Sequence, residues 1–322
     1  MNTELTLFDD NYHDINIISS DVDFEVGDSN ALNNFEITAE PFSAKGFYIE
    51  GTEYGGVFEY EHGTSDATKE TIKGWTWRGL LTQGIIMPPT GSDYRIVSGD
   101  ANAVLSGLLS DYLGGFFTVP DEASGCTISN YQFPLYVNLL DGIMGMLAEY
   151  NYRLSIHAEK IASGAPFVVY VEAVPSIQVG GVFNADSPAQ LEFTYNRMGI
   201  NHLICMGTGE LQQRMRVDLY LNAAGEVTQT QYYTGFDERT ALYDYSSAQS
   251  RADLIEYGKK RLLEIASSNT VSVHAKNGEE MEIGDTVLAA YKGQTVVTPI
   301  VRKILKIDRE MISIEYKTKG EI

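Results

Sequence analysis

The chain contains few cysteines, few tryptophans and few positive charges. Its 322 residues include 2 Cys, 2 Trp and 23 Lys or Arg against 44 Asp or Glu, which gives a formal net charge of −21. Two cysteines specify no disulfide framework, and neither Cys126 nor Cys205 has a neighbour at metal-ligand spacing. We expect Cys205, in the apolar run "LICMG", to be a buried thiol. The reactivity of Cys126, in a Gly/Ser-containing loop, stays open.

The shortage of cations argues against whole classes of function. Nucleic-acid binding draws its affinity largely from Lys and Arg on phosphates, so we expect no specific nucleic-acid binding. No apolar run is long enough to cross a bilayer, and the N-terminus lacks the basic and apolar regions of a signal peptide. The sequence therefore predicts a soluble protein made in the cytoplasm, without stable membrane insertion. Its acidic surface serves solubility or forms a wall that repels DNA.

Motifs for chemistry are also missing. The five histidines, among them His157, form no HExxH or HxH pattern, and no GxSxG nucleophile motif is present. "DVDFEVGD" departs from a calcium loop, and its alternating apolar residues predict a strand instead. On a strand, His157 and Glu159 would share one face. We predict no catalytic residue, no metal site and no cofactor, and hence a protein that is not an enzyme.

Strand patterns dominate the first 90 residues. Seven short runs are separated by Asn, Asp, Gly and Ser at a spacing typical of an antiparallel sandwich or barrel. These runs are "TLFDD", "DINIISS", "VDFEVG", "NNFEITAE", "GFYIEG", "YGGVFEYE" and "ETIKGWTWRGLL".

The pattern changes over residues 96–180. A helix is predicted after Ser98 or Asp100, ending at Gly114-Gly115, and a second helix over "FPLYVNLLDGIMGMLAEYN". Two strands, "YRLSIHAEK" and "PFVVYVEAVPS", follow them. This pattern predicts a small α+β insert.

Strands return over residues 181–245, with a hairpin at "LNAAGEV". A helix capped by Ser246 or Ser247 is predicted next, because apolar residues recur at helical spacing through "ADLIEYGKKRLLEIA". The last segment, 269–322, again alternates like strands.

The stretch "GWTWRGLL" holds both tryptophans, Trp75 and Trp77. On a continuous strand they would share one face, with Thr76 and Arg78 on the other. Core packing and subunit contact are the commoner uses of such a pair, and sugar stacking is the alternative. We therefore take Trp75, Trp77 and Arg78 as packing or subunit-contact candidates, and expect Arg78 to pair with a carboxylate.

Several of these stretches, in this order, resemble the tail-tip (baseplate) hub proteins of long-tailed bacteriophages and prophages. The resemblance rests on "NNFEI", "GTEYGG", "WTWRGLL" ahead of a Pro-containing loop, "IEYGKKRLLEIASS" and "EIGDTVLAAYKGQTVVTPIVRKILKID". It covers most of the chain. It implies a β-rich α+β fold of two β-barrel-like domains, with an α+β insert in the first and a linking helix before the last. The expected divisions are 1–95 with 181–245, the insert 96–180, the helix 246–268 and the C-terminal domain 269–322.

The same resemblance implies a function. Three subunits would form a ring that joins the tail tube to the tip, and DNA and the tape-measure protein would pass through it. The implied partners are further copies of the chain, the distal tail protein, the tape-measure protein and tip or fibre proteins, at the tail tip of the virion. Two alternatives remain at this stage: a cell-wall hydrolase (peptidase or glycosidase) and a carbohydrate- or receptor-binding module using the two tryptophans.

Overall fold

The chain forms two compact units. The computed structural model describes residues 4–29, 33–64, 68–113, 115–183, 190–194, 198–248, 250–266, 270–275, 281–291, 294–308 and 311–318. Unit 1 comprises Met1–Glu192 and Ser272–Thr318, and unit 2 comprises Phe193–Val271 with Lys319–Ile322. The chain leaves unit 1 within strand β14 (Gln190–Thr194) and returns within β19 (Thr270–Ala275).

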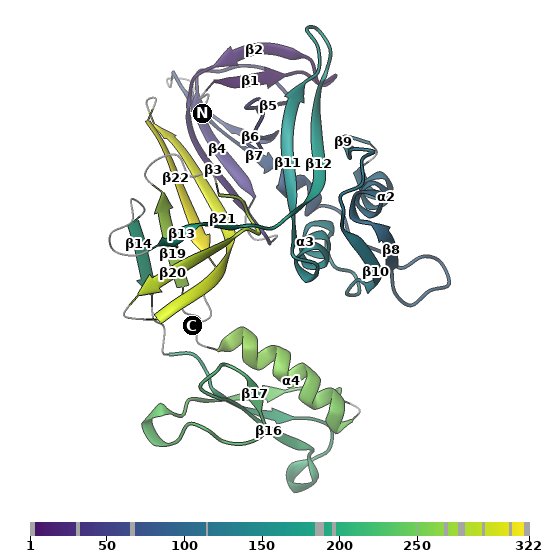
Figure 1. The fold of residues 1–322 in the computed structure, drawn as a ribbon, viewed down its shortest axis with the longest axis vertical. Helices are drawn as coiled ribbons and strands as arrows, with labels where there is room; N and C mark the ends of the chain where they lie inside the picture. The colour runs from purple at the N-terminus through teal and green to yellow at the C-terminus, as the bar shows by residue number, and fades with distance from the viewer. Residues whose placement is uncertain are drawn as a thin grey trace. The chain divides into compact units, whose positions relative to one another are not determined.

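The N-terminal part of unit 1 is an antiparallel sheet, which curves in Figure 1. All seven predicted runs contain a strand, so that prediction is confirmed. The strands are β1 (Leu5–Phe8), β2 (Asp14–Ile18), β3 (Asp21–Gly27), β4 (Asn34–Ala39), β5 (Gly46–Tyr48), β6 (Gly55–His62) and β7 (Glu70–Thr76). Their order in the sheet is β3-β4-β7-β6-β5-β1-β2.

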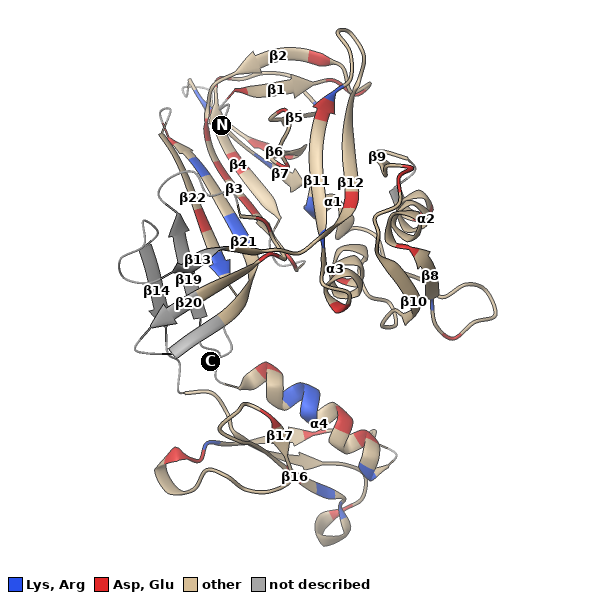
Figure 2. Cartoon of the chain, in the orientation of Figure 1, with Lys and Arg blue, Asp and Glu red and all other residues tan. Residues whose placement is uncertain are grey.

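Alternation along these strands separates an aromatic core from a charged face. Inward residues include Phe24 and Phe35, whose rings stack at 6.1 Å. Gly74 leaves room for this packing, since a Cβ there would lie 1.9 Å from Val57 O and 2.6 Å from the Phe35 ring. On the opposite face, Asp23 of β3 and Glu36 of β4 lie directly opposite one another. Figure 2 shows acidic residues along both strands.

C-terminal strands complete this sheet. β21 (Gln294–Asp308) pairs with β3 and β22 (Met311–Thr318) through its second half, and with β20 (Thr286–Tyr291) through its first half. β20 in turn pairs with β13 (Gln178–Phe183). This grouping differs from the predicted division, which joined 1–95 to 181–245. Cross-strand apolar partners far apart in sequence decide the pairing, and periodicity along one strand does not identify them.

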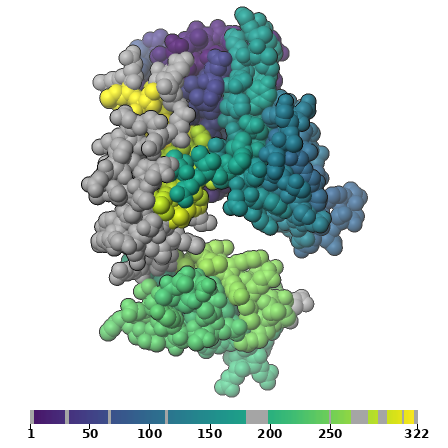
Figure 3. Space-filling model, viewed as in Figure 1, coloured from purple at the N-terminus to yellow at the C-terminus, as the bar shows by residue number. Residues whose placement is uncertain are grey.

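Residues 96–175 pack onto the sheet of unit 1. Their elements are β8 (Ile96–Asp100), α2 (Ala101–Leu113), β9 (Phe117–Thr118), β10 (Thr127–Gln132), α3 (Leu139–Glu149), β11 (Tyr152–Lys160) and β12 (Phe167–Pro175). The predicted helix–helix–strand–strand order is confirmed, with short strands between the helices. The buried residues of this block form one core with Phe8, Tyr48 and Trp77 of the N-terminal segment. Figure 3 shows the blue atoms of the earlier part of this block packed against the teal atoms of the part that follows it in the sequence.

Unit 2 is a sheet covered by one helix. Its strands run in the order β17-β16-β15-β18. Their bounds are β15 (His202–Met206), β16 (Arg216–Leu221), β17 (Val227–Thr228) and β18 (Thr240–Asp244). The predicted hairpin at "LNAAGEV" joins β16 to β17, where Asn222 N donates to Glu226 O.

Helix α4 (Arg251–Ile265) packs on this sheet through Leu254 and Leu262, so it belongs to a packed unit. Its N-cap is Ser250, which forms a capping box with Asp253. The prediction of Ser246 or Ser247 as the cap is therefore wrong. Asp253 stands three residues after Ser250, and its carboxylate accepts a hydrogen bond from Ser250 N.

Candidate functional site: a buried ion cluster and an acidic pocket

The two tryptophans do not share a strand face, so that prediction is wrong. β7 ends at Thr76, and the short helix α1 (Trp77–Leu81) begins at the next residue. The Thr76 hydroxyl accepts a hydrogen bond from Gly79 N at 3.1 Å. Threonine is a favourable N-cap because it satisfies an amide that the first helical turn leaves free. The local cap thus overrides the alternation that the sequence suggested.

Trp77 lies wholly inside unit 1. Its side chain is 0% exposed and packs against Phe8, Phe116 and Phe167 at ring distances of 6.2, 5.6 and 6.1 Å. Trp75 is partly exposed on the sheet. Trp77 therefore offers no free ring face for stacking on a sugar.

Arg78 follows directly and is also buried. Its Nε donates to Glu53 Oε2 at 2.9 Å, which confirms the expected carboxylate partner. Its Nη2 donates to Leu154 O at 2.9 Å, and its Nη1 contacts Met144 Sδ at 3.6 Å. One side chain thus connects α1 with the turn before β6, with β11 and with α3.

Lys303 of β21 extends this connection to the C-terminal segment. Its Nζ lies 3.0 Å from Glu53 Oε1 and 2.9 Å from Glu282 Oε2, and 5.0 Å from the centre of the Tyr54 ring. The side chains of Lys303 and Glu53 are each 5% exposed. We call Glu53, Arg78, Glu282 and Lys303 the ion cluster.

The charges of the ion cluster depend on one another. Burial disfavours the ionised form of Glu53, but Lys303 and Arg78 outweigh it and lower its pKa to about 2. The pKa of Glu282 is raised by burial and by the charge of Glu53. Burial opposes the charge of Lys303, but the neighbouring Glu53, Tyr54 and Glu282 raise its pKa well above the usual value. Glu53 is therefore the anion that both cations share.

This arrangement suits a structural role. Each cation is held by protein groups, and removing one partner of a buried pair leaves a charge without compensation, which is strongly destabilising. Of the four members of the ion cluster, the sequence pattern singled out Arg78 alone. A signal existed for Lys303, because it occupies an inward position of the alternation Lys303, Leu305, Ile307.

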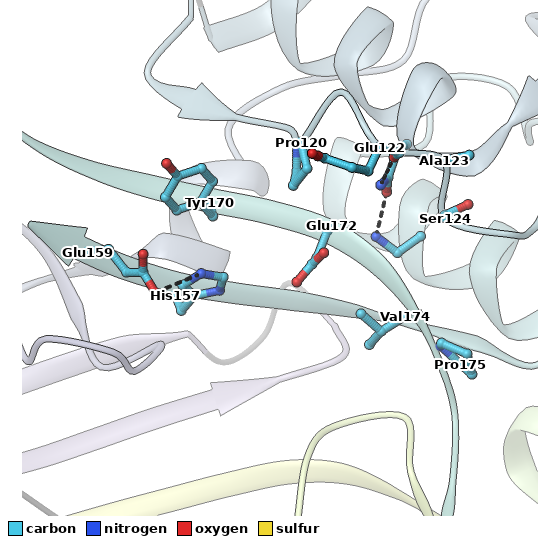
Figure 4. Close-up of a pocket in the computed structure, with 12 residues that line it drawn as sticks. Pro120, Glu122, Ala123, Ser124, His157, Glu159, Tyr170, Glu172, Val174 and Pro175 are labelled. Atoms are coloured by element: carbon cyan, nitrogen blue, oxygen red, sulfur yellow. Dashed lines mark hydrogen bonds and ion pairs between the residues drawn. The ribbon is translucent and has the colours of Figure 1, made fainter. Parts of the chain in front are cut away.

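An acidic pocket of about 520 Å³ lies along the ribbon of β11 and β12 (Figure 4). His157 and Glu159 lie on the same face of β11, as predicted, and both line the pocket. His157 Nε2 is 3.6 Å from Glu159 Oε1. Tyr170, on the neighbouring strand, stacks on His157 with 5.3 Å between the two ring centres. Glu172 and Glu122 add two more carboxylates to the lining.

The pocket does not assemble a nucleophile with a base. Its serine, Ser124, donates from Oγ to Asp100 Oδ2 at 2.9 Å and accepts from Cys126 N, so its hydroxyl is engaged away from His157. Within the described ranges, no group of three or more His, Cys, Asp or Glu side chains is placed to hold a metal ion. Of the helices described, none is long and apolar enough to span a bilayer.

Comparison with known proteins gives a fold-level answer. No protein-family model matches the chain, and no curated protein sequence does. Among solved structures, a chain of the p2 virion baseplate in its activated conformation is similar at a TM-score of 0.54 and 10% identity, covering 99% of both chains. This chain has the fold of phage tail and baseplate proteins.

Two bacterial tail proteins agree with this result. The tail protein from Neisseria meningitidis MC58 is similar at a TM-score of 0.52 and 10% identity, over 99% of this chain and 96% of that one. The 43 kDa tail protein of prophage MuSo2 from Shewanella oneidensis has the same score and identity over 98% of both. The resemblance to tail-tip proteins and the β-rich α+β fold class are thereby confirmed at the level of fold.

Proposed function

We propose that this chain is a structural component of a phage or prophage tail tip, a hub that joins the tail tube to the tip. The observation that carries the proposal is similarity to tail and baseplate proteins over 98–99% of this chain and 96–99% of theirs. The similarity therefore spans unit 1 with its α+β block as well as unit 2. A shared module fused to something else would cover only part of each chain.

In this role three copies form a ring, and DNA and the tape-measure protein pass through its centre. The net charge of −21 supports this, because a wall of like charge repels phosphates and lets the nucleic acid move through. The other partners are the distal tail protein and the tip or fibre proteins of the virion, assembled after synthesis in the bacterial cytoplasm.

A role without catalysis fits the polar groups described above. The most deeply buried charges hold segments of unit 1 together, and the serine in the acidic pocket is bonded away from the histidine. Neither arrangement favours the hydrolase alternative. The burial of Trp77 removes one of the two rings on which a sugar-binding reading depends.

The test is assembly. The chain would be purified alone and together with the products of its neighbouring genes, then measured by light scattering coupled to size-exclusion chromatography and by electron microscopy. We expect rings of three copies within a tail-tip particle, and tape-measure and distal tail genes directly upstream. A chain that stays monomeric and outside every tail particle in the presence of those proteins would overturn the proposal. So would release of fragments from purified peptidoglycan.

A further inference from the structure

His202 in unit 2 lies between two carboxylates. Its Nε2 is 3.0 Å from Asp218 Oδ1 on β16, and its Nδ1 is 2.7 Å from Glu238 Oε1, just before β18. The ring stacks on Tyr220 at 4.2 Å, and the residue is 8% exposed. The opposite face of the sheet carries Leu203 and Leu219, and α4 packs on that face. The groups that face this imidazole are therefore those of β16 and of the segment leading into β18.

Both contacts require a proton on each ring nitrogen. A neutral imidazole has one N–H and one lone pair, so it can donate to only one of two carboxylates. The imidazolium donates to both, and such charge-assisted hydrogen bonds are about twice as strong as neutral ones. Only the imidazolium can therefore satisfy both contacts at once.

The two carboxylates are not equivalent. Asp218 also receives two hydrogen bonds from Arg216, at 2.8 and 2.7 Å, and its pKa is lowered by Arg216 and, against some burial, by His202. Within the described part of the chain, His202 is the one cation that contacts Glu238. Thr240 Oγ1 lies 3.1 Å from the same Nδ1 and can donate a hydrogen bond to it once the proton has left. Loss of the proton therefore leaves Asp218 with a cation and Glu238 without one.

Glu238 ends an exposed loop. Residues 229–239 connect β17 to β18, and the part up to Glu238, loop 229–238, carries Tyr232, 56% exposed, and Phe236, fully exposed. The end of the loop is held by Asn201, whose Nδ2 donates to Asp237 O at 2.7 Å, and by the contact of Glu238 with His202. The next residue, Arg239, is fixed by its N donating to Asn201 Oδ1 and by its Nε donating to Gly199 O, both at 2.8 Å. Of these contacts, the one between Glu238 and His202 depends on a titratable proton.

We propose that the proton on His202 Nδ1 is a latch that holds loop 229–238 to the sheet of unit 2, and that its loss releases Glu238 and frees the loop with Tyr232 and Phe236. Asp218 stays paired with Arg216 in both states, and Thr240 takes the place of Glu238 at Nδ1. The latch makes the mobility of a loop that carries two exposed aromatic side chains dependent on pH. It stands on the geometry of unit 2 and does not depend on the proposed function.

The experiment is hydrogen exchange of the full chain between pH 5 and pH 9, read by mass spectrometry and corrected for the intrinsic pH dependence of exchange. We expect protection of the amides of loop 229–238 to fall about tenfold or more as pH rises, the scale of losing one hydrogen bond to a charged group. The amides of α4 serve as an internal reference and should keep their protection. Exchange at the His202 C2 position reports its proton, and its midpoint should coincide with the loop transition.

Two variants decide the assignment. Glu238→Gln removes the carboxylate that needs the proton, and it should abolish the pH step in the loop. Asp237→Asn makes the same charge change one residue away and should keep the step. Loop protection that does not change with pH in the unmodified chain would overturn the proposal. A step that persists in Glu238→Gln, or that is lost equally in both variants, would do the same.

Discussion

Substitution of Lys303 by methionine tests the ion cluster most directly. Methionine keeps much of the apolar stem but removes the ammonium that lies 3.0 Å from Glu53 and 2.9 Å from Glu282. Glu53 then retains Arg78 as its one cation in the cluster, at 2.9 Å. The variant therefore leaves a buried carboxylate with half of its compensation.

The burial of the pair gives the magnitude. Lys303 and Arg78 lower the pKa of Glu53 to about 2 against the effect of burial, so the folded chain favours the ionised carboxylate. Breaking a buried pair by removing one partner costs about 3–5 kcal/mol. We expect Lys303→Met to lower the free energy of unfolding of unit 1 by about 3 kcal/mol at pH 7.

The loss should depend on pH in a defined direction. Because the folded pKa of Glu53 is lowered, its contribution is complete above 4.5 and disappears as pH falls toward 2. Glu282 has a raised pKa, so as the pH falls it takes up a proton before Glu53 does. Protonation removes the cost of burying the charge of Glu282. The difference between the unmodified chain and Lys303→Met should therefore be largest near neutral pH and shrink below pH 4.5.

The assay is guanidinium unfolding followed by tryptophan fluorescence. Both tryptophans lie in unit 1, so the signal reports that unit. Lys306→Met is the matched control, because Lys306 lies on the same strand and pairs with Asp23 at 3.0 Å, but both side chains are more than half exposed. Such surface pairs contribute about 0–1 kcal/mol. If Lys303→Met costs no more than Lys306→Met, the ion cluster does not stabilise unit 1 as argued.

Two further pairs of substitutions follow from packing. Trp77→Ala should destabilise unit 1 by about 3–5 kcal/mol, because the ring is fully buried. The measurement is chemical unfolding followed by circular dichroism, and Trp75→Ala, the control, should cost clearly less. Equal losses would contradict the different burial of the two rings. Gly258→Ala should lower protection of α4 amides from hydrogen exchange by about 1–3 kcal/mol, because a Cβ there would lie 2.6 Å from Cys205 Sγ and 2.7 Å from Leu219. Gly107→Ala in α2 is the control, because nothing lies within 4 Å of the added carbon, and it should stabilise its helix by about 1 kcal/mol. If Gly258→Ala also increased stability, α4 would not approach its sheet as closely as described.

Prediction from sequence worked where the cause is local. The alternation of Val22, Phe24 and Val26 predicted β3, and the spacing of His157 and Glu159 placed them on one face, because side chains of a strand alternate regardless of its partners. The prediction failed at Trp77, where one hydroxyl of Thr76 capped a helix in the middle of an apparent strand.

The groups with the most unusual environments could not be found in this way. Glu53 and Lys303 are 250 positions apart in the sequence, and neither stands in a motif. His202 faces Asp218 and Glu238 because strands β15 and β16 and the segment leading into β18 bring them together. Five histidines without a pattern gave no reason to choose it. An acidic chain offers many carboxylates, so the sequence shows that anions are abundant but not which of them a buried cation will meet.

The sequence by itself determined the strands, the helical block near residues 96–150, the acidic surface and the order of motifs that resembles tail-tip proteins. These features depend on neighbouring residues or on totals that folding does not change. Only the tertiary structure decided that β21 joins β3, that Trp77 turns inward and that buried charges hold distant segments together. Those outcomes depend on which surfaces exclude water from one another, and that choice is made by the whole chain at once.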